Sequence, residues 1–176
     1  VNPRATLLKE LYLPKTILSA DVIISVPKMK THKLAGITLS LKNMFGVVPG
    51  MKYGWPKNTL HWNGIPLSIC EINGTIKTHY SIIDGIVGME GHGPIMGTAK
   101  KAGVLVMGAN ALSVDATAAR VMGVDPARVD YLVMAQTIKL GSLRSEDIAV
   151  AGEKIEQARA DFVLDPEYSF LRAPKG

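Results

Sequence analysis

Acidic residues are missing from one long stretch of this chain. No aspartate or glutamate lies between Asp21 and Glu71, yet the stretch holds six lysines and two histidines: Lys28, Lys30, Lys33, Lys42, Lys52, Lys57, His32 and His61. The flanking parts contribute +1 (residues 1–21) and −2 (residues 71–176), so this stretch alone accounts for the net charge of +5. A field of one sign over so short a length attracts anions. The sequence therefore predicts an anionic ligand or partner.

Cysteine is almost absent, and its scarcity excludes two kinds of site. The single Cys70 cannot form an internal disulfide. An iron–sulfur cluster needs about four thiolates. We therefore expect no iron–sulfur cluster in this chain, and a reducing, cytoplasmic setting.

Long apolar runs and arginine are also missing. The longest apolar runs are far shorter than the roughly 20 residues of a membrane-spanning helix, so no membrane partner is expected. The acid-free stretch contains no arginine, which argues against nucleic acid as a partner, although Tyr53, Trp55 and Trp62 could stack on bases. The chain begins at Val1 rather than Met, which fits a processed protein or a piece of a longer chain.

Strand and helix patterns alternate along the chain. Its 176 residues are 47% apolar and 20% charged, which is the composition of one globular domain. We expect strands at 21–26, 80–84, 103–107 and 148–151, and helices at 37–46, 66–77, 114–122 and 127–139. The alternation predicts a single α/β domain over residues 1–176, with a mostly parallel sheet and flanking helices. Residues 152–176 are charged and turn-rich and are expected to form a tail along the surface.

The first candidate site is the segment 27–43, which follows the first expected strand. Ligands of open α/β sheets bind beyond the carboxyl ends of the strands. A phosphate, carboxylate or anionic cofactor would meet several groups there, namely Lys28, Lys30, Thr38 and Asn43. His32 could transfer protons or ligate a metal, and Lys42 could clamp an anion or act as a nucleophilic amine. The alternative is a solvated basic loop in which His32 is merely hydrogen-bonded.

The second candidate site is the glycine-rich loop at residues 88–97. Closely spaced glycines let backbone N–H groups turn inward and form an anion-binding concavity, and the glycines that would form it are Gly91, Gly93 and Gly97. Asp84 ends the strand before the loop and is a candidate catalytic carboxylate. The alternative is a tight connection whose glycines serve only the backbone geometry.

A transition metal is a third candidate ligand. Its side-chain ligands would come from residues far apart in sequence: His32, His61, Glu90, His92 and Asp115. No pair has a diagnostic spacing such as His-x-x-x-His. Asp115 has an alternative role in the first turn of a helix, where a carboxylate complements the helix dipole.

Three motifs follow one another along the chain. They are Pro27-Lys-Met-Lys-Thr-His-Lys-Leu-Ala-Gly with Leu41-Lys-Asn-Met-Phe-Gly, then Asp84-Gly-Ile-Val-Gly-Met-Glu-Gly-His-Gly-Pro-Ile-Met-Gly, then Ala111-Leu-Ser-Val-Asp-Ala. Together they resemble the domain of unknown function 362 family, over about residues 17–141. The positions that match the family's pattern are His32, Lys42, Asn43, His61, Asp84, Glu90, Gly91, Gly93, Pro94, Gly97 and Asp115. Members of this uncharacterised family often occur with ferredoxin-type iron–sulfur domains, so the resemblance implies an iron–sulfur protein as a partner.

His32 is followed by Ala-Gly, by Lys42 ten positions on, and by Pro49-Gly50. This pattern is similar to the motif of the nickel-pincer lactate racemase family. The similarity implies proton transfer at a substrate α-carbon for His32 and attachment of the pincer cofactor for Lys42. That family has glycines before the lysine, where this chain has the bulkier residues 39–41. We take the similarity as support for an anion or cofactor site, not for racemase activity.

Two hypotheses about function follow. In the first, residues 28–57 and 88–97 form one cleft for an anionic small molecule or cofactor, with His32 as the acid/base group, Lys42 as the clamp or attachment point and Asp84 as the facing carboxylate. Whether such a cleft belongs to an enzyme is left open by the sequence. In the second, the chain is a non-catalytic module that docks an iron–sulfur protein or another acidic partner through its lysines. A buried Lys42 favours the first hypothesis, and splayed, solvated lysines favour the second.

Overall fold

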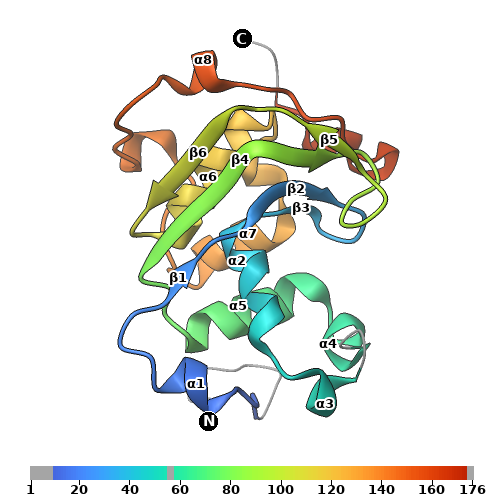
Figure 1. Ribbon diagram of the computed structural model, residues 1–176, viewed down its shortest axis with the longest axis vertical. Helices are drawn as coiled ribbons and strands as arrows, with labels where there is room; N and C mark the ends of the chain where they lie inside the picture. Colours follow the sequence, from blue (N-terminus) through green and yellow to red (C-terminus); the bar gives the residue numbers. More distant parts are fainter. Residues whose placement is uncertain (1–9, 55–57, 174–176) are drawn as a thin grey trace.

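One long strand organises the sheet of this protein (Figure 1). The computed structural model describes residues 10–54 and 58–173. The strands are β1 (Ile24–Ser25), β2 (Lys28–His32), β3 (Gly36–Thr38), β4 (Tyr80–Glu90), β5 (Thr98–Lys100) and β6 (Val104–Gly108). Along one edge of β4 run β1 and β2, both parallel to it, and along the other edge run β5 and β6, both antiparallel; β3 pairs antiparallel with β2. The expected α/β class, with a parallel sheet centre and flanking helices, is confirmed.

Pro27 divides what would otherwise be one strand into β1 and β2. A proline has no N–H to donate to a neighbouring strand, but its carbonyl still accepts a hydrogen bond from the N–H of Asp84 at 2.9 Å. The expected strand at 21–26 is therefore short, and the chain continues beside β4 beyond the proline. This continuation carries His32 to the end of the sheet.

β4 is longer than the sequence predicts, because it runs through the first part of the glycine-rich segment. A side chain at Gly88 would place its Cβ 2.5 Å from the carbonyl oxygen of Met29 on β2. The glycine therefore allows β2 and β4 to approach each other closely. The loop itself is confined to residues 91–97.

Helices lie behind this sheet and below it in Figure 1. The longer ones are α5 (Ile65–Thr75), α6 (Ala111–Val121) and α7 (Asp130–Thr137), close to three of the expected helices. The shorter ones are α1 (Lys15–Leu18), α2 (Ser40–Asn43), α3 (Gly50–Tyr53), α4 (Asn58–Trp62) and α8 (Ile155–Ala158), with single 3-10 turns at Met44–Val47, Pro126–Arg128, Ser145–Asp147 and Pro166–Leu171. In Figure 1, α6 and α7 lie behind the sheet, and α6 packs on β4 and β6 through fully buried alanines. The fourth expected helix, at 37–46, is wrong in its first part, where β3 ends and the extended Leu39 precedes α2.

Residues 148–151 do not form the strand that the sequence predicts. They run without strand pairing between the 3-10 turn at Ser145–Asp147 and α8. The following tail does more than lie along the surface, because the Phe162 side chain is fully buried and Leu171 nearly so. Phe162 packs beside Gly88 and thereby covers the middle of the sheet.

The other face of the sheet carries exposed apolar side chains. Alternate residues of the strands, including Ile24, Ile86, Leu105 and Met107, are about half exposed there, at 49% to 54%. Strands with apolar residues on both faces are typical of sheets that are covered on both sides. Within the described residues, no helix is both long and apolar enough to cross a membrane.

Candidate functional site

His32 is the most strongly perturbed group of the basic segment. It lies at the end of β2 and is 7% exposed. Burial has the largest effect on the pKa of its imidazole, and the nearby charges of Lys42, Lys30, His61 and Lys33 add to it, so that the pKa is lowered to about 4. Within the described part of the chain, the charged groups that lower this pKa are thus all basic. The ring is neutral at physiological pH, inside a cluster of positive charge.

One hydrogen bond decides which nitrogen of His32 carries the proton. The backbone N–H of Leu34 donates to Nδ1 at 3.0 Å. Nδ1 must therefore be unprotonated, and the neutral ring carries its proton on Nε2. In this state His32 presents a hydrogen-bond donor to a ligand. Binding a metal through Nε2 would require the loss of that proton, and Nδ1 is already occupied.

Lys42 and His61 meet at the ring of Phe45. The Lys42 Nζ lies 4.4 Å from the centre of the Phe45 ring, and the His61 ring meets the same ring edge-on with centres 5.4 Å apart. A cation over an aromatic face is stabilised by the ring quadrupole. Phe45 therefore holds the half-buried Lys42 beside His32. The sequence analysis did not single out Phe45, although an aromatic residue three positions after a helical lysine is a recognisable signal.

Lys30 and Thr38 complete the basic cluster from the sheet. Lys30 and Thr38 are direct partners in the antiparallel β2–β3 pair, so their side chains lie on the same face of the sheet. His32 follows two residues after Lys30 on β2, and its side chain shares this face. Thr38 is 7% exposed, and among the described residues its hydroxyl has no hydrogen-bond partner. Such a buried hydroxyl costs free energy until a ligand or water satisfies it.

Asp115 fixes the position of the helix that carries Lys42. Its carboxylate, fully buried on α6, accepts hydrogen bonds from the N–H groups of Ser40 (2.7 Å) and Leu41 (2.9 Å) at the start of α2. Burial raises the pKa of Asp115 to about 8, against the lowering effect of the two N–H donors. The expected metal ligand is instead a cap for α2, supplied by another helix.

Further hydrogen bonds hold α2 from three sides. The Ser40 hydroxyl lies 2.6 Å from that of Ser81 on β4, and the Asn73 amide on α5 donates to the carbonyl of Leu41 at 2.9 Å. Asn43, expected to bind a cofactor, donates to the Ser25 hydroxyl at 3.1 Å. These residues position Lys42 and do not themselves contact a ligand site.

The glycine-rich loop packs on the end of β2 beside His32. The Thr31 hydroxyl donates to the carbonyl of Gly91 at 2.8 Å, and the Lys33 N–H donates to that of Gly93 at 2.9 Å. Of the three glycines expected to face an anion, two have N–H groups that are used within the protein, since that of Gly91 donates to Val163 and that of Gly93 to Gly91. At the third, Gly97, a Cβ would collide with the carbonyl of Glu90. Gly93 and Gly97 thus serve close packing, and the loop lies next to the basic cluster.

We expect Gly93→Ala to lower the free energy of unfolding by about 2 kcal/mol, because a Cβ there collides with the backbone of Thr31. Chemical denaturation measures the change. Gly91→Ala is the matched control: its Cβ would meet no atom within 4 Å, and only its φ of +76° opposes the change. Equal losses in the two variants would contradict the packing role of Gly93.

The acidic candidate residues and His92 interact with partners other than His32. Asp84 accepts a hydrogen bond from Lys28 across the β2–β4 pair at 2.6 Å, and this bond lowers the pKa of the exposed carboxyl. The Glu90 carboxylate accepts from the N–H of Val163 and lies 3.5 Å from Lys100, and His92 pairs with Asp165 at 2.7 Å. Across the described part of the chain, no three His, Cys, Asp or Glu side chains are placed to hold a metal ion. The structure thus brings together His32, Lys42, His61, Lys30 and Thr38, and it leaves Asp84, Lys28, Glu90, His92 and Asp115 outside this group.

A family model matches more than half of this chain. The model of the family described as a domain of unknown function, DUF362, matches residues 1–120. The chain belongs to this family. The basic segment, the glycine-rich loop and Asp115 all lie within the matched residues, so the family region contains the whole basic cluster.

One curated relative extends well beyond the part that matches. The thylakoid-associated protein sll1697 of Synechocystis sp. is 31% identical over 138 residues, which are 77% of this chain and 43% of the relative. The chain thus spans less than half the length of that relative. No solved structure matches the chain.

Proposed function

We propose that this protein binds an anionic small molecule or cofactor at the cluster of Lys30, His32, Lys42 and His61. The observation that carries the proposal is that, among the described residues, the charged groups that lower the pKa of the buried His32 are all basic. An anion would offset this concentration of positive charge, accept a hydrogen bond from Nε2 of His32 and satisfy the hydroxyl of Thr38. Lys33 lies in the turn after β2 and adds to the same field.

His32 acts in this proposal as a neutral hydrogen-bond donor. Its ring stays uncharged down to about pH 4, and its proton lies on the nitrogen that Leu34 leaves free. A neutral imidazole with this tautomer can polarise a carbonyl or carboxylate oxygen of the ligand. Because Nε2 already carries a proton, it cannot accept another one. An acid/base role of His32 would therefore begin with the donation of this proton to the ligand. A transition metal has no part in the proposal.

The pKa of His32 tests the proposal directly. In the free protein we expect the His32 ring to titrate near pH 4, as followed by its imidazole NMR signals. Saturation with inorganic phosphate or lactate, one phosphate and one carboxylate probe, should raise this pKa by about one unit or more, because a bound anion favours the imidazolium. The signals of His79 serve as the internal control, since that residue lies at the opposite end of β4, where its Nδ1 accepts a hydrogen bond from the N–H of Ile23 at 3.1 Å. An unchanged His32 pKa with both probes would contradict an anion site.

Docking of an iron–sulfur protein or another acidic partner is the second candidate function. Lys33 and Lys52 are exposed and could meet an acidic surface. Lys42, however, is half-buried against Phe45, and Lys28 is paired with Asp84. The lysines are therefore not a uniformly solvated face, and the structure favours the anion site. Lys57 lies outside the described residues. The cytoplasmic setting stays a prediction from the cysteine content.

A further inference from the structure

β6 has one unpaired edge within the described residues. One edge pairs with β4 from Ser81 opposite Gly108 to Gly85 opposite Val104. On the other edge no strand is hydrogen-bonded to β6 in the part of the chain that the structure describes. An open strand edge can accept a further strand through its free N–H and C=O groups.

The hydrogen-bond pattern shows which groups of β6 face outward. The N–H of Asp84, the register partner of Leu105, donates to the carbonyl of Pro27 at 2.9 Å, so the backbone groups of Asp84 face away from β6. In an antiparallel pair every second residue bonds to the partner, so Val104 and Val106, opposite Gly85 and Ile83, face β4 with their backbone groups. The N–H and C=O groups of Leu105 and Met107 therefore point away from β4.

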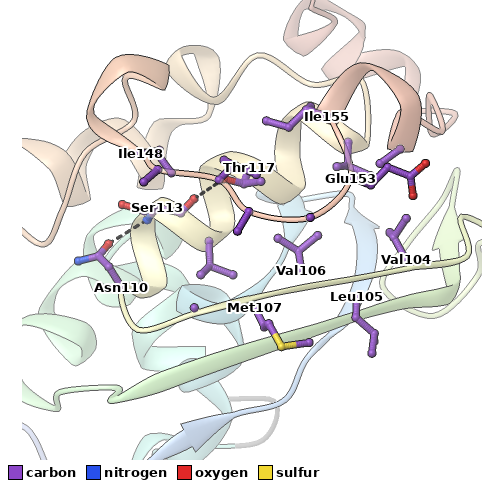
Figure 2. A pocket seen from close by; sticks show the side chains of 18 of the residues that line it. Val104, Leu105, Val106, Met107, Asn110, Ser113, Thr117, Ile148, Glu153 and Ile155 are labelled. Carbon is purple, nitrogen blue, oxygen red and sulfur yellow. Dashed lines mark hydrogen bonds between the residues drawn. The ribbon is translucent and has the colours of Figure 1, made fainter.

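A groove of about 650 Å³ lies along this open edge (Figure 2). Its walls are β6, α6 and the segment 147–158. Figure 2 shows Val104 and Val106 pointing into the groove, and Leu105 and Met107 pointing away from it. The far wall is fixed at both ends, because Asp147 accepts a hydrogen bond from Ser142 at 2.7 Å and α8 packs on α6.

The volume of the groove is close to that of one β-strand. A five-residue strand is about 17 Å long, neighbouring strands are about 4.8 Å apart, and the side chains on both faces span about 10 Å, which gives a slab of roughly 800 Å³. Residues 148–151, Ile-Ala-Val-Ala, have the composition of a strand, yet they stay unpaired across the groove from β6.

The lining specifies the chemistry of the occupant. Val104, Val106, Ile148 and Ile155 are apolar, and the Thr117 hydroxyl is already bonded to the Ser113 carbonyl at 2.9 Å. The charged residues along the groove, Asp147 and Glu153, are both acidic. A complementary strand carries apolar residues at alternate positions and a basic residue near one end.

We propose that this groove takes one extended strand from polypeptide beyond the matched region of longer family members, so that β6 becomes an inner strand of the sheet. The matched part covers only 43% of the curated relative, which leaves more than half of that protein to supply such a strand. The proposal concerns the sheet edge and does not depend on the anion site at His32.

Peptide binding tests the proposal. Fluorescein-labelled overlapping peptides should cover the part of the thylakoid-associated relative outside its 138 matched residues, and their anisotropy is measured against the 176-residue chain. We expect one run of overlapping peptides with alternate apolar residues to bind saturably. N-methylation of every second residue should weaken binding about 30-fold in the register that faces β6, because it removes two or three hydrogen bonds of about 1 kcal/mol each. Methylation of peptide positions that bond to neither wall should leave the affinity within about threefold.

Three variants locate the bound peptide. Val106→Arg fills the groove and should abolish binding, whereas Leu105→Arg, on the opposite face of the same strand, should not. Glu153→Lys on the exposed rim should weaken a peptide with a basic end without disturbing the fold. The proposal is overturned if no peptide binds, or if binding ignores N-methylation and Val106→Arg. It is also overturned if light scattering shows a dimer with protected Leu105 and Met107 amides, because a second copy would then occupy the edge.

Discussion

Asp115→Ala should lower the free energy of unfolding by about 4 kcal/mol, the largest effect that we expect from a single substitution. The change leaves two buried N–H groups, those of Ser40 and Leu41, without an acceptor, at about 1–3 kcal/mol each, and it opens a small cavity in the core. Urea denaturation measures the loss. Asp125→Ala is the matched control, because Asp125 caps a 3-10 turn in the same way but at the surface, by accepting from the N–H of Ala127 at 3.0 Å. We expect that control to cost about 1 kcal/mol.

The stability of the protein should also depend on pH through Asp115. The folded-state pKa of about 8 exceeds the ordinary value of 3.8, so between these values the folded protein holds a proton that the unfolded chain releases. Stability therefore falls as pH rises through this window, by at most about 1.4 kcal/mol per pH unit. His32 acts in the opposite direction below pH 6.5, because its folded-state pKa is lowered to about 4. We therefore compare the free energies of unfolding between pH 6.5 and 8, where His32 has no such effect. The decrease with pH that Asp115 causes in this range should vanish in Asp115→Asn. A wild-type slope that persists in Asp115→Asn would contradict this assignment.

Lys42→Met should weaken the binding of phosphate or lactate by about 30-fold. A charge-assisted hydrogen bond contributes about 1.5–3 kcal/mol, and methionine keeps the apolar stem of the lysine against Phe45 while removing the charge. Isothermal titration calorimetry gives the affinities. Lys101→Met removes the same charge from an exposed position after β5 and should leave the affinity within about twofold, as expected for a screened surface charge.

The same variant has a readout that needs no ligand. Lys42 is the first charge among the causes that lower the pKa of His32, so Lys42→Met should move this pKa upward from about 4. Loss of anion affinity together with an unchanged His32 pKa would show that Lys42 acts away from His32. Equal loss of affinity in Lys42→Met and Lys101→Met would show that only net charge matters.

The sequence by itself determined the parts of this protein that depend on local pattern. Apolar periodicity predicted α5, α6 and α7, and short β-branched runs predicted β4 and β6. The absence of acidic residues between Asp21 and Glu71 marked the basic segment that contains His32 and Lys42. Ordered motifs gave the family, which the match over residues 1–120 confirmed. None of these inferences needed a contact between residues distant in the chain.

The strand expected at 148–151 shows where local pattern stops being sufficient. Its residues favour a strand, but a strand forms only when a neighbour lies close enough to share hydrogen bonds. Here β6 lies across a groove, and the segment stays unpaired. The helix expected at 37–46 failed for a related reason, because pairing with β2 drew residues 36–38 into β3.

Only the tertiary structure decided what each polar residue does. Asp84, Glu90, His92 and Asp115 carry the same chemical groups as a metal site, and the fold directs each of them to a different partner. The low pKa of His32 arises from burial and from Lys42 and His61, which lie ten and 29 positions away in the sequence. Desolvation and electrostatic interactions depend on distance in space, so they become fixed only when the fold brings Lys42 and His61 near His32.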